Sequence, residues 1–197
     1  TKRLDEVWDR LDFGGVWFNR KQRELAEQMI ARFARWHEEN RSGMVATEQG
    51  FAVMLGDDVC IKGRVDRIQR DEADRPVIID IKTGTSKPSE AELERHPQLG
   101  VYQLAALLGA FTRLGLRAEP GGAALVQVGK AAGTGGVKEQ RQRPLADDPD
   151  PEWARNLVRD VAEGMARPTF TARVNDGCRS CAVKTSCPVN DDGGHVC

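Results

Sequence analysis

The sequence predicts an α/β fold in which helices flank a mixed central sheet. Three observations lead to this fold class. Several short runs are rich in Val and Ile or alternate apolar with polar residues, as strands do. Longer segments repeat apolar residues at spacings of three or four, as amphipathic helices do. The predicted order is a long helix, three strands, a helix, two strands and a helix, followed by a C-terminal tail rich in cysteine.

The composition is that of a globular protein. The chain has 197 residues, of which 30% are charged and 40% hydrophobic, enough for one domain with its own core. No apolar run reaches membrane-spanning length and no signal peptide opens the chain, so we expect no membrane partner and a cytoplasmic location. Because the sequence begins at Thr1 in a charged, helix-like stretch, we expect it to be a fragment of a longer protein.

The N-terminal segments are predicted to be helical. A short helix covers Leu4–Leu11, and Gly14 and Gly15 interrupt the pattern. Trp17–Asn40 is predicted to form a long amphipathic helix. Its aromatic residues could stack on nucleic acid bases, although packing against the sheet or a neighbouring domain is the commoner role.

Three strands are predicted to follow. Met44–Leu55 and Val59–Gln69 read as strands joined by a turn at Gly56-Asp57-Asp58. Val77–Lys82 is the third strand, reached across the polar loop Arg70–Arg75. We expect the second and third strands to pair as a hairpin.

The second half of the chain returns to helices and strands. Ser89 is a suitable N-cap for a helix that continues, with a break at Pro97, to about Leu114. The glycine-rich stretch 129–136 lacks the Gly-Lys-Ser/Thr of a phosphate loop and is predicted to be a flexible turn. The remaining predicted elements are a strand over Gly121–Lys130, an edge strand over Lys138–Pro144 and a helix from about Pro149 to Ala166.

Charged side chains lie within the third predicted strand. Because side chains alternate along a strand, Asp80 and Lys82 share one face while Ile79 and Ile81 point to the other. A hairpin with the preceding strand would bring Asp66 close enough for both carboxylates to bind one cation. The alternative is an ordinary surface ion pair between Asp80 and Lys82, which stabilises little. That alternative does not explain why charged residues interrupt a core-like run, where an uncompensated charge is costly.

Gln98 and Tyr102 lie four residues apart, so they share one face of the predicted helix. Tyr102 is the only tyrosine in the chain. The pair is either a surface glutamine beside a core tyrosine or part of a functional site, and the functional interpretation is favoured.

These residues carry a resemblance to a known family. The runs Gly63-x-x-Asp66-Arg67-Ile68, Asp80-x-Lys82-Thr83-Gly84 and Gln98-Leu99-x-x-Tyr102 resemble successive motifs of the PD-(D/E)xK nuclease superfamily, which has a restriction-endonuclease-like fold. The RecB/AddB-type branch, found in bacterial helicase–nuclease subunits and AdnAB-like proteins, is the most similar. The likeness covers roughly residues 48 to 108, and Arg75-Pro76 departs from the Pro-Asp of the superfamily's name.

The resemblance implies a site for Mg²⁺ or Mn²⁺. Asp66, Asp80 and the carbonyl of Ile81 would be the metal ligands, and oxygen ligands suit magnesium. Lys82 would orient the attacking water and stabilise developing negative charge. The family usually supplies a further ligand histidine from an upstream helix, and neither His37 nor His96 stands in a matching motif.

The remaining implied roles concern the substrate. Gln98 would point at the scissile phosphate or the metal's water, and Tyr102 would shape the pocket. Arg67 and Lys87 would contact phosphates or be ordinary surface charges. An acidic residue often stands where Glu48 does, supporting the metal or a basic neighbour, and a plain exposed glutamate is equally consistent.

The cysteine motif Cys178-x-x-Cys181-x5-Cys187 predicts a metal site rather than disulfides. Soft thiolates select an iron–sulfur cluster or zinc, and a tail without metal is the third alternative. The motif resembles part of the 4Fe-4S staple of AddB-type nuclease domains, whose fourth cysteine lies far upstream. Here the upstream ligand is missing unless Cys60 or Cys197 replaces it.

The resemblance implies a DNA exonuclease of double-strand-break repair and recombination, with residues 1–170 as the nuclease domain and 171–197 as its cysteine-rich tail. Its partners would be DNA, a helicase domain of the same polypeptide and a second helicase–nuclease subunit. The net charge of −1 indicates that this domain is not the main source of DNA affinity. The alternatives are a degenerate nuclease fold that binds DNA or acts as a scaffold, and a stand-alone Cas4-like exonuclease.

Overall fold

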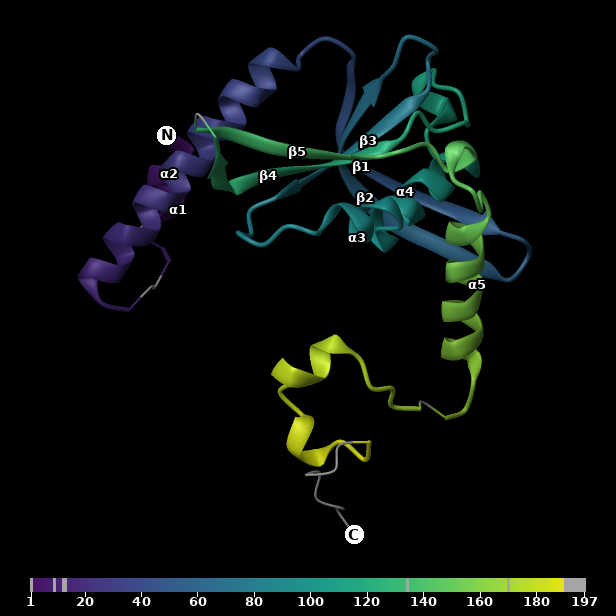
Figure 1. The fold of residues 1–197 in the computed structure, drawn as a ribbon. Coiled ribbons are helices and arrows are strands. Elements are labelled where there is room, and N and C mark those ends of the chain that lie inside the picture. Colours follow the sequence, from purple (N-terminus) through teal and green to yellow (C-terminus); the bar gives the residue numbers. More distant parts are fainter. Residues whose placement is uncertain (1, 9, 12–13, 134, 170, 190–197) are drawn as a thin grey trace. The chain divides into compact units, whose positions relative to one another are not determined.

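The computed structural model describes residues 2–8, 10–11, 14–133, 135–169 and 171–189 of the chain (Figure 1). Contacts within the chain divide it into two compact units, one ending at Val158 and the other starting at Arg159. The first unit contains the sheet and the second contains the cysteine motif. None of the helices in the described ranges is both long and apolar enough to cross a membrane.

A five-stranded mixed sheet forms the centre of the first unit. Its strands are β1 (Met44–Leu55), β2 (Val59–Arg70), β3 (Pro76–Lys82), β4 (Ala123–Ala132) and β5 (Gly136–Gln142), and they lie side by side in this order. β3 and β4 are parallel, and the other neighbouring pairs are antiparallel. The predicted α/β class with a mixed sheet is confirmed, and β5 is an edge strand as predicted.

The helices overlap the predicted segments, with ends that differ by several residues. They are α1 (Lys2–Trp8), α2 (Val16–Glu39), α3 (Glu90–Glu94), α4 (Pro97–Leu107) and α5 (Trp153–Ala166). Ser89 caps α3 through a capping box with Glu92, which satisfies backbone N–H groups that the first helical turn leaves free. Pro97 starts α4, so the predicted break between the two helices is confirmed.

The helix expected to reach Leu114 ends at Leu107 instead. Gly109 has a φ of 89°, which a residue inside a right-handed helix cannot adopt. A short 3₁₀ turn over Thr112–Leu114 follows, and Gly115 closes it in the left-handed region. The apolar pattern continues through this turn because Phe111 is buried in the core, and the pattern alone therefore predicted a longer helix.

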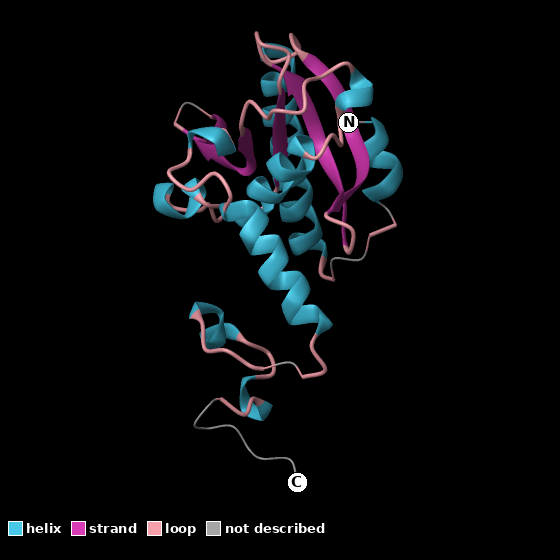
Figure 2. Ribbon diagram, turned by 90° about the vertical axis from the view of Figure 1, so that its right-hand side faces the viewer, coloured by secondary structure: helices cyan, strands magenta, loops and turns pink. Residues whose placement is uncertain are grey.

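Different helices cover the two faces of the sheet (Figures 1 and 2). Ile79 packs with Trp36 of α2, and we call this side the α2 face. Ile78 packs with Leu99 of α4 on the opposite side, the α4 face. Because side chains alternate along β3, Asp80 lies on the α4 face with Ile78.

Candidate active site

Asp80 and Lys82 lie together on the α4 face of β3, the central strand of the sheet. β3 has a hydrogen-bonded strand on each side, and the Asp80 side chain is 5% exposed whereas that of Lys82 is 35% exposed. Lys82 Nζ lies 2.8 Å from Asp80 Oδ2. The two residues therefore form an ion pair whose carboxylate is buried, which distinguishes it from an ordinary surface pair.

Helix α4 brings an amide onto this ion pair. Gln98 Oε1 accepts a hydrogen bond from Lys82 Nζ at 2.7 Å, and Gln98 Nε2 donates to Asp80 Oδ1 at 2.9 Å. The same Nε2 donates to Tyr102 Oη, one turn further along α4, at 2.9 Å. Gln98 thus joins the helix to the strand, and four of the predicted site residues form one connected network.

Asp66 reaches β3 through the backbone. The ladder between β2 and β3 ends where Arg67 pairs with Ile79. One residue further along β2, Asp66 Oδ2 accepts a hydrogen bond from the Ile81 N–H at 2.7 Å. The carboxylate takes the place of a ladder carbonyl at the point where the strands separate. This contact holds a second carboxylate near Asp80.

The backbone around Asp66 departs from regular alternation. Val65 and Ile68 are three residues apart, yet both pack in the core of the α4 face, where strict alternation would place them on opposite faces. On the neighbouring strand β1, Glu48 has a φ of 49° and the ladder skips this position. Glu48 lies 3.7 Å from Arg64, and both side chains are largely exposed. This exposed pair agrees with either alternative for Glu48, the support of a basic neighbour or a plain exposed glutamate.

Burial dominates the electrostatics of Asp80. The loss of solvent raises the pKa of its carboxyl above the usual value; Lys82 and His96 oppose this rise, and the carboxylate of Asp66 adds to it. Asp80 Oδ2 is buried and, despite the ion pair with Lys82, has no hydrogen bond of good geometry within the described residues. A further cation at this oxygen would stabilise the ionised carboxylate.

His96 belongs to the same group of charges. It is the N-cap residue of α4, and its Nδ1 is buried without a hydrogen-bond partner in the described part of the chain. Burial lowers the pKa of His96 and so does Lys82, whereas Asp80 and Glu92 oppose this effect. The sequence did not predict a role for His96. Its position directly before Pro97 and Gln98 was the only signal.

The donors present suit a hard cation that keeps part of its water shell. Asp66 and Asp80 offer carboxylate oxygens and Ile81 offers a carbonyl, which are the ligand types that Mg²⁺ prefers. No group of three or more His, Cys, Asp or Glu side chains within the described ranges is arranged to hold a metal ion. The residues therefore fit a metal bound by one or two carboxylates and water, as Mg²⁺ commonly is, and not a cage made of protein ligands alone.

Arg67 points away from this site, into the α2 face. Its residue is 1% exposed, and its guanidinium lies 4.8 Å from the centroid of the Trp36 ring. It contacts His37 Nδ1 at 2.9 Å and donates to the carbonyl oxygen of Asn40. Burial lowers the pKa of Arg67. The structure therefore replaces the expected phosphate contact of Arg67 with a structural role that ties α2 to the sheet.

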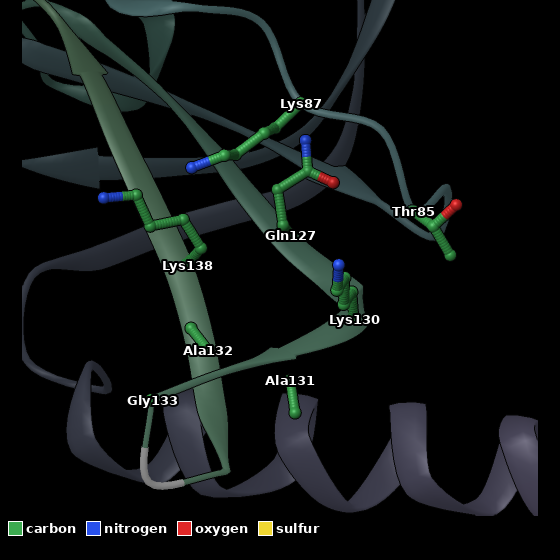
Figure 3. A pocket seen from close by; sticks show the side chains of 8 residues that line it. All are labelled: Thr85, Lys87, Gln127, Lys130, Ala131, Ala132, Gly133 and Lys138. Carbon is green, nitrogen blue, oxygen red and sulfur yellow. The ribbon is translucent and has the colours of Figure 1, made fainter.

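Lys87 lies beside the network and not within it. It is exposed and lines a hollow of ≈ 330 Å³ together with residues of β4 and β5 (Figure 3). One of these, Gln127, pairs with Lys82 across β3 and β4. Gln127 was not predicted as a site residue because its strand reads as core. A polar residue inside that apolar run was the available signal.

The cysteine motif lies in the second unit. Cys178 is part of a 3₁₀ turn over Asp176–Ser180, and Cys187 follows another over Lys184–Ser186. Cys178, Cys181 and Cys187 are free thiols, as is the exposed Cys60 of β2. The described cysteines do not gather into a metal-binding group. Cys197 lies outside the described residues.

Comparisons with known proteins identify the family of the chain. The sequence profile described as the PD-(D/E)XK nuclease superfamily matches residues 1–188. Among curated proteins, no sequence matches the chain. One similar solved structure is described as "Crystal structure of SSO0001"; it is 21% identical, with a TM-score of 0.49, and the match covers 84% of this chain and 69% of that chain.

Proposed function

Because the chain belongs to the PD-(D/E)XK nuclease superfamily, we propose that it hydrolyses DNA phosphodiester bonds in a reaction that depends on Mg²⁺ or Mn²⁺. The observation that carries the proposal is the buried Asp80 carboxylate, which is held by Lys82 and Gln98 and retains one oxygen without a hydrogen bond from the described residues. Burial of this charge lowers the free energy of unfolding unless a partner compensates it. A cation bound at this site, together with a phosphate, would offset that cost.

Each residue of the network has a role in this proposal. Asp66, Asp80 and the carbonyl of Ile81 would hold the cation, whose chemistry is to acidify a water and offset the charge of the phosphate. Lys82 Nζ keeps a positive charge at the same place and can donate to the attacking water or to a phosphate oxygen. Gln98 fixes the positions of Asp80 and Lys82, and Tyr102 fixes Gln98.

We further propose that the domain acts as the exonuclease of a RecB/AddB-type helicase–nuclease, of the AdnAB-like kind, in double-strand-break repair. Its partners would be a helicase domain in the same polypeptide and a second subunit. The ordered motifs around Asp66, Asp80 and Gln98 support this narrower assignment. The nuclease domain would comprise residues 1–170, and the tail 171–197 would bind metal as part of the same domain.

The tail is proposed to hold a 4Fe-4S cluster in the intact protein. The support is the spacing of Cys178, Cys181 and Cys187 and the preference of iron–sulfur clusters for thiolates. A fourth ligand is required, and a cysteine upstream of this chain, Cys60 or Cys197 would provide it. Anaerobic purification followed by iron and sulfide analysis tests this part of the proposal.

Asp80→Asn tests the metal-dependent reaction. The variant should lose cleavage of a labelled DNA strand by at least about 100-fold, since removal of one electrostatic catalytic group commonly has this effect. Asp57→Asn is the matched control, because Asp57 is exposed in the turn between β1 and β2. Near-normal cleavage by a folded Asp80→Asn protein would refute the proposed mechanism.

Thermal unfolding provides a second readout that does not depend on activity. Because burial raises the pKa of Asp80, its ionised form opposes folding at neutral pH, so Asp80→Asn should unfold at the same or a higher temperature without metal. Mg²⁺ at ten times its dissociation constant should stabilise the unsubstituted protein by about 1.4 kcal/mol. The substituted protein should show little of this gain. An equal response of both proteins to Mg²⁺ would argue against Asp80 as a metal ligand.

A further inference from the structure

A basic hollow adjoins the Asp80 network on the same side of the sheet. The hollow, of ≈ 330 Å³, is lined by the side chains of Lys87, Lys130, Lys138, Gln127 and Thr85 and by the chain at the end of β4. Figure 3 shows the three lysines arranged around the Gln127 amide. None of the described residues that line the hollow is acidic.

Strand pairing connects the hollow to the candidate active site. Lys82 of β3 pairs with Gln127 of β4, and Gln127 pairs with Lys138 of β5. Residues paired across a sheet present their side chains on the same face. Adjacent strands lie about 4.8 Å apart, so Gln127 and Lys138 are roughly 5 and 10 Å from Lys82 along the sheet. These distances correspond to a few nucleotides, because duplex DNA rises about 3.4 Å per nucleotide along one strand.

The described residues do not neutralise the charges of the hollow. Among the described residues, no carboxylate forms an ion pair with Lys87, Lys130 or Lys138. Gln127 is only 5% exposed, and its amide makes no hydrogen bond within the same part of the chain. The amide atoms are not among the fully buried polar atoms that lack a partner, so they are accessible from the hollow that Gln127 lines. Three lysines without a carboxylate partner and an accessible amide donor suit an anion that carries hydrogen-bond acceptors.

We infer that this hollow is a second phosphate-binding site, which holds a phosphate group of the substrate strand a few nucleotides from the scissile bond. The lysines supply the attraction, and the Gln127 amide donates to a phosphate oxygen. The inference rests on the proposed nuclease function, since that function puts a nucleic acid strand at Lys82. The phosphate is either an internal diester or the terminal monoester of a strand end, and both offer the same oxygen acceptors.

Binding measurements without divalent metal test the inference separately from cleavage. The full chain is titrated against a fluorescent single-stranded DNA over a range of salt concentrations, with Lys130→Ala, Lys138→Ala and the double variant. Each lysine removed should lower the slope of log affinity against log salt by about 0.7, the value for one phosphate contact on a single strand. Lys62→Ala is the matched control, because Lys62 is an exposed strand lysine that does not line the hollow.

A neutral substitution separates hydrogen bonding from charge. Gln127→Met keeps the length of the side chain and removes its donor, so it should weaken binding several-fold while the salt slope stays unchanged. Strands with a 5′-phosphate, a 3′-phosphate or neither distinguish the two sources of the phosphate. A loss confined to one phosphorylated end assigns a terminal group, and an equal loss for all three strands assigns an internal one.

The inference is overturned if Lys130→Ala and Lys138→Ala bind like Lys62→Ala at every salt concentration. It is also overturned if the unsubstituted chain shows no salt-dependent binding. Failure of the proposed function has a different signature, in which the lysine variants show the predicted slopes but Mg²⁺ supports no cleavage. Because Lys130 is exposed and Lys138 half-exposed, these variants should fold even if Gln127→Met does not.

Discussion

Gly129 of β4 packs directly against the backbone that follows Lys82, and Gly129→Ala tests whether this contact positions Lys82, the proposed catalytic lysine. A Cβ atom at Gly129 would lie 2.1 Å from the carbonyl oxygen of Thr83 and 2.3 Å from that of Gly84. Contacts below 3.0 Å are essentially never made by real Cβ atoms. The obstructing atoms are backbone, so no side-chain rotation can relieve the clash.

The expected effects follow from this geometry. The segment after Lys82 must move by about 0.9 Å for the closest contact to reach 3.0 Å. Overpacking of this kind costs about 1–3 kcal/mol. In a chain of this size, 2 kcal/mol lowers the melting temperature by about 4–8 °C. A displacement near 1 Å at a catalytic group can reduce the rate about 100-fold, so activity should fall more than stability does.

The assay compares Gly129→Ala with Gly136→Ala by thermal unfolding and by Mg²⁺-dependent cleavage of DNA. Gly136 is a strand glycine where an added Cβ would have no neighbouring atom of the described residues within 4 Å, so its substitution should be neutral or stabilising by up to about 1 kcal/mol. Equal melting temperatures and equal cleavage rates for the two variants would refute the argument. Lower stability with normal cleavage would show that the segment after Lys82 adjusts without moving the lysine.

Three further substitutions test other contacts. Ser89→Ala removes the capping box of α3 and should reduce the free energy of unfolding by about 1 kcal/mol in denaturant titrations, whereas an unchanged midpoint would show that the cap contributes nothing. Arg67→Met removes the hydrogen bonds of the guanidinium to the Asn40 carbonyl, which keeps Gln69 as a donor, and to His37, and it should cost about 1–3 kcal/mol. The salt slope of DNA binding should not change; a reduced slope would restore Arg67 as a phosphate contact. Asp148 accepts hydrogen bonds from the Asp150 N–H and from Arg95, which hold the pKa of its carboxyl below the usual value. The ionised Asp148 carboxylate stabilises the folded protein above the unfolded-state pKa, and this stabilisation is lost as pH falls through the lower folded-state pKa. Asp148→Asn should therefore be less stable than the unsubstituted protein near neutral pH and equally stable in strong acid. A stability difference that stays constant with pH would contradict this.

Local signals in the sequence predicted the strand and helix that carry the site. The alternation around Asp80 predicted its shared face with Lys82, because a strand repeats every two residues regardless of its neighbours. Ser89 and Pro97 marked helix starts through capping and through the fixed φ of proline. Gln98 and Tyr102 were placed on one helical face, where their side chains are hydrogen-bonded.

Long-range packing decided the features that the sequence did not predict. The sequence around Arg67 does not show on which face of the sheet its side chain lies. Its burial depends on contacts with Trp36 and His37, about thirty positions upstream. Gln127 became a neighbour of Lys82 only because β3 and β4 run parallel, in a register set by the helical crossover between them. The end of α4 was missed because Phe111 continues the apolar pattern beyond the helix.

The central position of β3 links the fold to the chemistry. An edge strand would leave Asp80 hydrated, and its carboxylate would then have little need for a cation. With β2 and β4 on both sides and α4 above, the carboxylate loses water, and Lys82 and Gln98 offset only part of that loss. The parallel partner β4 supplies Gln127 at the next position along the sheet, and β5 supplies Lys138 beyond it. The same strand order that buries Asp80, the proposed metal ligand, therefore places positive and polar side chains beside it, where we infer that phosphates of the substrate strand bind.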